Sequence, residues 1–197
     1  MPEPNDDTSE MLRRARQGDQ IAVGALFDRH RDRLRRMVQL RMDDRLQGRV
    51  DPSDVLQDAF LTFAQSLADY LRNPAIPFYL WLRFITGRKL QALHRHHLGT
   101  HMRAVGREAS FYRGALPQAS SVSLAAQLLG RLTTPSQAAM RVELQLRIQE
   151  ALSQMDHIDR EVLTLRHFEQ LSNVETAQVL GLTEAGASNR FIRALKR

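Results

Sequence analysis

The chain has 197 residues, enough for one domain or two small ones, and its 28 Lys and Arg against 22 Asp and Glu give a net charge of +6. This excess of basic residues favours a polyanionic partner such as nucleic acid. The absence of cysteine excludes structural disulfides and thiolate metal sites. No apolar run is long enough to span a membrane, and residues 1–10 are too polar for a signal peptide, so we expect a cytoplasmic protein without a membrane segment.

Apolar residues recur three and four positions apart along most of the chain, which is the period of an amphipathic helix. Such segments cover residues 9–17, 19–47, 53–70, 77–98, 140–155 and 159–170, and two short helices follow. The pattern predicts an all-α protein with two small helical domains, residues 1–103 and 143–197, joined by a flexible linker over residues 104–142. Glycine, serine and proline interrupt the period in this linker, although residues 123–132 could hold a short helix.

The helix predicted over residues 51–65 has two unlike faces. One face gathers apolar side chains that belong in a core, namely Leu56, Phe60 and Phe63, with Leu67 in the following turn. The opposite face carries carboxylates, amides and one leucine, namely Asp54, Gln57, Asp58, Leu61 and Gln65. An acidic stripe repels phosphate, so on a basic chain it suits a basic protein partner. An ordinary solvated helix face would show the same pattern.

The predicted loop over residues 69–77 is a candidate for holding an unstacked base. Tyr70 supplies a ring, Arg72 and Asn73 supply donors, and Pro74 biases Asn73 toward extended backbone. An ordinary polar turn is the alternative. Trp81 shares an apolar stripe with its helical neighbours, so we expect it in the core rather than against DNA.

Basic residues and histidines fill the segment that follows. Three histidines, His94, His97 and His101, share a helical face and invite a metal site, but no acidic residue or cysteine lies in the run to complete it. We therefore expect no metal or other cofactor and predict a phosphate-facing surface, with a solvated helix as the other alternative. The residues assigned to this surface are Arg83, Arg88, His94 and Arg95.

The last quarter of the chain has the layout of a helix-turn-helix. Ser172 and Glu175 have the spacing of a capping box, Gly181 can close the first helix, and Thr183 can cap the second. The second helix, residues 183–197, turns a mainly polar and basic face outward, formed by Asn189, Ile192, Arg193 and Lys196, with Ser188, Arg190 and Arg197 on its flanks. Amide and guanidinium groups on a basic helix suit the major groove of DNA.

Within that face, Asn189 and Arg193 are expected to read base edges, while Arg190 and Arg197 flank them toward the phosphates. The solvated face of a helical hairpin is the plainer alternative.

Several segments together resemble a known family. Residues Asp51-Pro52-Ser53-Asp54-Val55-Leu56-Gln57-Asp58-Ala59-Phe60-Leu61 resemble a motif of bacterial RNA polymerase sigma factors of the extracytoplasmic-function class. Four further blocks follow the order of that family, namely Gly18-Asp19 with Ala25-Leu26-Phe27, Phe78 with Trp81-Leu82 and Ile85, Arg160-Glu161-Val162-Leu163, and Arg190 with Arg193-Ala194. The blocks cover most of residues 8–103 and 143–197.

The resemblance implies a sigma factor that directs promoter-specific initiation. It implies docking of the 51–65 helix on core RNA polymerase, minus-10 recognition and melting of the non-template strand by residues 69–103, and minus-35 reading of double-stranded DNA by the 183–197 helix. It leaves an anti-sigma protein open as a further partner. Ser188 and Asn189 stand where the family often has Lys and Ser, so the minus-35 sequence does not carry over.

No catalytic motif is visible, and we do not expect an enzyme. Two other functions remain open at this point. One is a stand-alone helix-turn-helix regulator, which would not need the acidic face, and the other is a metal-dependent enzyme that uses the histidines.

Overall fold

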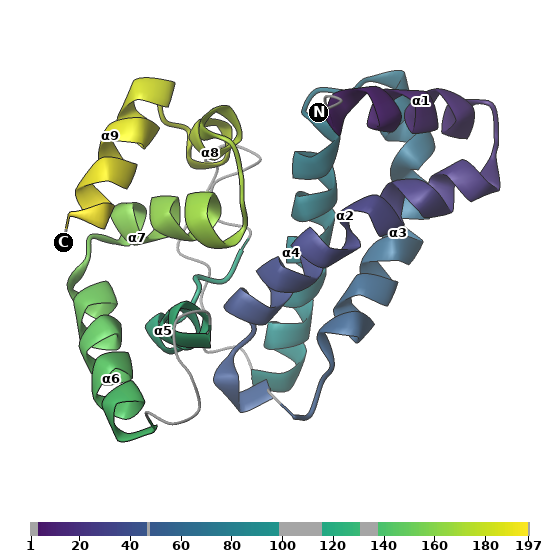
Figure 1. Ribbon diagram of the computed structural model, residues 1–197. Coiled ribbons are helices and arrows are strands. Elements are labelled where there is room, and N and C mark those ends of the chain that lie inside the picture. The colour runs from purple at the N-terminus through teal and green to yellow at the C-terminus, as the bar shows by residue number, and fades with distance from the viewer. Residues whose placement is uncertain (1–3, 47, 99–115, 131–137, 197) are drawn as a thin grey trace.

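The computed structural model describes residues 4–46, 48–98, 116–130 and 138–196 (Figure 1). Every regular element in these ranges is helical, as the sequence predicts. None of the described helices is long and apolar enough to cross a membrane.

The N-terminal group of helices contains α1 (Pro4–Arg16), α2 (Gln20–Arg41), a single turn η1 (Asp44–Leu46), α3 (Pro52–Arg72) and α4 (Phe78–Leu98). Its core joins aromatic rings from three helices, with Phe63 of α3 lying between Phe27 of α2 and Phe78 of α4 at centroid distances of 5.6 and 6.1 Å. Asp19 caps α2, and Asp51 caps α3 in a capping box with Asp54.

The C-terminal group contains α5 (Ser121–Gly130), α6 (Ala138–Gln154), α7 (His157–Leu163), a wider turn η3 (Thr164–Phe168), α8 (Asn173–Leu180) and α9 (Glu184–Leu195). The helix-turn-helix of α8 and α9 has the predicted caps. Ser172 and Glu175 form the capping box, Gly181 is left-handed at φ 61°, and the Thr183 hydroxyl accepts from the Gly186 amide at 3.0 Å. The small residues Ala177 and Ala187 are buried where the two helices pack.

Part of the predicted linker is helical and packed. Helix α5 begins after Ser120, whose hydroxyl accepts from the Ser123 amide at 3.0 Å. Leu124 and Leu129 of α5 are buried in a cluster that also includes Leu40 of α2. The apolar residues of this segment follow the helical period, which is why it folds between the two groups instead of remaining irregular (Figure 1).

The two groups of helices share a core. Leu165, Leu171 and Val179 of the C-terminal group are buried in the same cluster as residues of α2, α3 and α4. Figure 1 shows α7 running toward the N-terminal group, with α5 between the two groups.

Candidate functional site

The predicted docking residues of α3 lie together on an open face. Asp54, Gln57 and Asp58 are exposed, and Leu61 is 59% exposed. Val55, Leu56 and Ala59 on the other side are buried. The division into a buried apolar face and an exposed acidic face is as predicted, because the helical period separates these residues.

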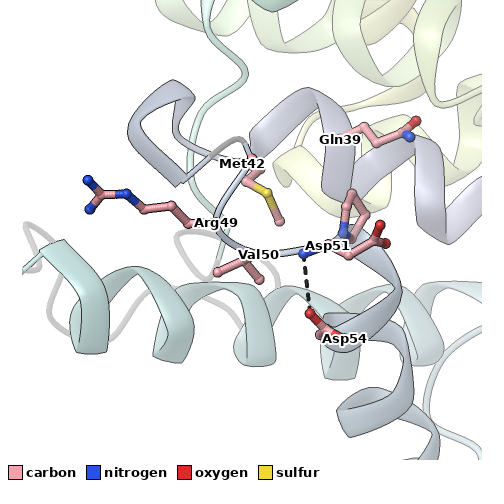
Figure 2. Close-up of a pocket in the computed structure, with 8 residues that line it drawn as sticks. Gln39, Met42, Arg49, Val50, Asp51 and Asp54 are labelled. Carbon is pink, nitrogen blue, oxygen red and sulfur yellow. Dashed lines mark hydrogen bonds between the residues drawn. The ribbon is translucent and has the colours of Figure 1, made fainter.

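Asp54 has a second role that the sequence analysis did not assign. Its carboxylate accepts a hydrogen bond from the Asp51 amide at 3.2 Å and so completes the capping box that starts α3 (Figure 2). Replacing Asp54 would therefore disturb the start of the helix as well as the acidic face. Asp58 has no such role in the cap and is the cleaner position for a test of docking.

A pocket of about 610 Å³ adjoins this face (Figure 2). Met42 and Val50 give it apolar walls, while Arg49, Asp51 and Asp54 add charges of both signs. Asp54 belongs both to the pocket and to the acidic face, so a protein that docks on α3 would border the pocket.

The predicted phosphate-facing surface of α4 is only partly present. Arg88 and Arg95 are exposed, as expected. The expected exposure is wrong for Arg83 and His94, each of which is only 4% exposed. The guanidinium of Arg83 is paired with Glu169 at 2.7 Å, and the His94 ring accepts from the Asp43 amide at 3.3 Å.

Burial explains the state of His94. Removal from water lowers the pKa of this ring, against the smaller opposing effect of Asp43. The neutral ring is also the form that can accept the Asp43 amide, so His94 is not the source of positive charge that the sequence analysis expected. His101, the third histidine of the considered metal face, lies outside the described residues, and no group of three metal-ligating side chains occurs within the ranges that the structure describes.

The candidate base-holding loop keeps two of its three predicted residues at the surface. Arg72 and Asn73 are exposed, with Arg72 paired to Asp69. Tyr70 is buried, and the expectation that its ring is available is wrong here. The ring stacks on Trp81 at 4.4 Å, and its hydroxyl donates to the Ile76 carbonyl at 2.8 Å. Tyr70 continues the apolar stripe of α3, a signal already present in the sequence.

Trp81 packs against the core, as predicted, although it is only partly buried. Its ring contacts Phe63, Tyr70 and Phe78 at centroid distances between 4.4 and 5.9 Å. We expect Trp81→Ala to destabilise the protein by about 3 kcal/mol, because it removes these contacts and leaves a cavity. Thermal unfolding measures this effect, and a transition equal to that of the unmodified chain would mean that Trp81 is free for another role.

The outward face of α9 is formed by Asn189, Ile192, Arg193 and Lys196, all of which are exposed. Ser188 and Arg190 are half-buried at its flanks. Arg197 lies outside the described residues. The face predicted from the helical period is therefore present in α9, with an amide and cationic groups available to a partner.

Two of its arginines are tied to a carboxylate that the sequence analysis missed. Asp159 of α7 has a side chain only 1% exposed, and it accepts from Nε and Nη2 of Arg193 at 2.7 Å and from Nη1 of Arg190 at 2.6 Å. These bonds, the one from Arg193 first, hold the pKa of Asp159 below its usual value. The carboxylate fixes both guanidinium groups relative to the helix that carries them.

This contact gives Asp159 a testable part in specificity. We expect Asp159→Asn to release Arg193 and to leave Arg190 only its contact with Asp156 at 3.4 Å, to tighten binding to every duplex, and to reduce the preference for a matched over a scrambled duplex by roughly tenfold. Fluorescence anisotropy on the two duplexes measures it.

Glu184→Gln is the matched control, since it removes one exposed carboxylate from the first turn of α9, the helix that carries the two arginines. This variant is expected to bind both duplexes more tightly and to keep the same ratio of affinities for the matched and the scrambled duplex. If Asp159→Asn and Glu184→Gln preferred the matched duplex over the scrambled one by the same factor, Asp159 would have no part in specificity.

Comparison with known proteins relates the chain to one family. The family model for sigma-70, region 4 matches residues 145–197. The sigma factor CnrH of Cupriavidus metallidurans is 31% identical over 97% of this chain and 92% of its own length. The sigma factor NccH of Alcaligenes xylosoxydans xylosoxydans is 29% identical over 98% and 93%.

A solved structure of CnrH in complex with the cytosolic domain of CnrY is similar over 97% of this chain and 94% of that chain, with a TM-score of 0.55 and 25% sequence identity. The likeness extends through both groups of helices, so it is not confined to the helix-turn-helix. On the strength of this full-length similarity, the chain belongs to the RNA polymerase sigma factors, in their extracytoplasmic-function class.

Proposed function

We propose that this chain is the promoter-specificity subunit of RNA polymerase for a set of its own promoters. The observation that carries the proposal is the helix-turn-helix of α8 and α9, which presents an amide and basic face within the region matched by the sigma-70 model. Sigma factors are initiation factors rather than enzymes, and the chemistry of transcription belongs to the polymerase to which they bind.

The acidic face of α3 is proposed as the polymerase-binding surface. Asp58, Gln57 and Leu61 combine charge, amide and an exposed apolar side chain on one side of a helix. This mixture fits a basic protein groove better than a nucleic acid, because phosphates would be repelled by the carboxylates. Asp54 adds charge to this face while it caps the helix.

Promoter contacts are proposed for two regions. Arg72, Asn73, Arg88 and Arg95 are exposed around the C-terminal end of α3 and along α4, and we assign them to the minus-10 element and the melted strand. The exposed face of α9 is assigned to the minus-35 element, where Asn189 is the residue best placed to read an adenine. Neither assignment requires a cofactor.

A protein partner that controls the chain is a further part of the proposal. The similar CnrH structure contains the cytosolic domain of CnrY, and we infer that this chain can bind an anti-sigma domain in a similar way. Such a domain would compete with polymerase for the chain.

Gel filtration of the purified chain with core RNA polymerase tests the proposal against a stand-alone DNA-binding regulator. A sigma factor elutes with the core enzyme at micromolar concentrations, whereas an independent regulator elutes alone. Elution apart from the core enzyme, with retained binding to duplex DNA, would favour the regulator.

A further inference from the structure

A cluster of four charged side chains joins the two groups of helices. Arg41 of α2 and Arg83 of α4 converge on Glu169, which follows η3 in the C-terminal group, and Glu161 of α7 also pairs with Arg41. The side chains of Arg41 and Glu169 are 1% and 0% exposed, and that of Arg83 is 5% exposed. A cluster this deeply buried is uncommon, because charged groups lose their hydration when they leave water.

The geometry around Glu169 is close and complete. Arg41 Nε donates to Oε1 at 2.7 Å, and Arg83 donates from Nε to Oε2 at 2.7 Å and from Nη2 to Oε1 at 3.3 Å, so both carboxylate oxygens are hydrogen-bonded and Oε1 is shared by the two guanidinium groups. Burial by itself would raise the pKa of Glu169, but Arg41 and Arg83 lower it to about 2. The carboxylate is therefore charged at any physiological pH, and its ion pairs are present whenever the two groups are in contact.

Other features of this interface oppose the contact. Gln170 adopts a positive φ of 58°, which is unfavourable for a residue other than glycine, and its carbonyl accepts from Arg33 at 3.0 Å. Arg33 Nε and the Tyr79 hydroxyl are buried nearby and have no hydrogen-bond partner among the described residues. The Gln170 backbone belongs to the turn between η3 and α8, but Arg33 and Tyr79 would regain water if the interface opened, so their lost hydration works against the ion pairs.

Arg83 connects this interface to the proposed promoter contacts. It lies on α4, the helix to which the minus-10 region is assigned, yet its guanidinium is occupied by Glu169. Carboxylate and phosphate are interchangeable partners for a guanidinium fork, since both present oxygens at matching spacing. One guanidinium cannot hold both at the same time.

We propose that Glu169 is an internal substitute for a DNA phosphate, and that its pairing with Arg83 and Arg41 holds the chain in a closed form that cannot bind the minus-10 region. This inference rests on the proposed function for its DNA step, while the closed and open forms can be measured without DNA. Opening separates the two groups of helices and with them the apolar contacts of Leu165, Leu171 and Val179 with the N-terminal group. It exposes Arg83 and exchanges the Glu169 carboxylate for a phosphate of the promoter.

The distance between the two groups is the direct readout. Because the chain contains no cysteine, spin labels can be placed at Ala64→Cys on α3 and Ala151→Cys on α6, both exposed positions. Pulsed electron spin resonance on the full chain then reports the closed and open populations. Glu169→Gln keeps the shape of the side chain but removes its charge, so it is expected to shift most of the population to longer distances.

Glu143→Gln is the matched control. It removes a carboxylate from an exposed ion pair with Arg147 on α6 and is expected to leave the distances unchanged. Circular dichroism of each variant confirms that the helices are retained. Distances in Glu169→Gln equal to those of the unmodified chain would overturn the proposal, as would the same shift in Glu143→Gln.

Binding to a single-stranded minus-10 oligonucleotide tests the exchange of partners. Glu169→Gln is expected to bind roughly tenfold tighter than the unmodified chain, because affinity rises with the fraction of open molecules. Arg83→Gln also breaks the interface but removes the guanidinium, so it is expected to open without this gain. A gain in Arg83→Gln equal to that in Glu169→Gln would refute the competition for Arg83.

Failure of the proposed function would look different. If no variant binds promoter DNA or core polymerase, while Glu169→Gln still lengthens the measured distance, the closed form stands and the assignment as a promoter-binding subunit falls.

Discussion

Asp58→Lys is expected to weaken binding to core RNA polymerase by about 2 to 5 kcal/mol, which is a loss of about 30-fold or more in affinity, if the carboxylate is desolvated against a basic groove. The reason is that Asp58 lies at the centre of the exposed acidic face of α3, beside Leu61, and has no part in capping the helix. Reversing its charge turns an attraction into a repulsion. Titration of labelled chain with core polymerase measures the affinity.

Asp28→Lys provides the control for this experiment. Asp28 is an exposed carboxylate on α2 of the same group of helices, so its replacement gives the same change of net charge away from the α3 face. Its affinity should remain close to that of the unmodified chain, since exposed charges contribute little. Unchanged binding by a folded Asp58→Lys variant would exclude the α3 face as the docking surface.

Asn189→Ala is expected to cost about 1 to 3 kcal/mol on a matched minus-35 duplex and little on a scrambled one. Asn189 is exposed on α9, two turns from the Thr183 cap, and its amide can pair with the donor and acceptor of an adenine. Loss of that pair relaxes specificity without changing the attraction to phosphates.

Lys196→Ala is the comparison variant, because Lys196 is exposed at the end of the same helix and carries only a point charge. Its loss should weaken both duplexes alike and make the salt dependence shallower by about one unit. Anisotropy titrations across a salt series separate the two patterns. Equal losses on both duplexes for Asn189→Ala would mean that α9 holds only the DNA backbone.

The local elements could be predicted from the sequence because their signals are local. Three such features depend only on residues close together in the sequence, namely the Ser172 capping box, the left-handed Gly181 and the Thr183 cap. All three are present in the structure. The same holds for the acidic face of α3, which depends only on the helical period. The apolar residues of helix α5 also follow the helical period, but they lie in a segment interrupted by small residues and proline. The sequence therefore indicates this helix only weakly.

The partners of charged residues could not be predicted in this way. Asp159 pairs with Arg193, which lies 34 positions later in the sequence. Glu169 pairs with Arg83, which lies 86 positions earlier. A helical wheel assigns Arg83 to a polar face but does not reveal which element covers that face. For the same reason His94 was expected in solvent, whereas the turn after α2 covers it through the Asp43 amide.

In vitro transcription shows whether this chain gives RNA polymerase its promoter specificity. Core polymerase free of other sigma factors is mixed with the chain and a library of genomic fragments, and the 5′ ends of the transcripts are sequenced. We expect transcripts that begin downstream of a shared pair of minus-35 and minus-10 sequences, and we expect Asp58→Lys to reduce their number sharply. Transcripts that begin at random positions, or at the same rate without the chain, would contradict this expectation.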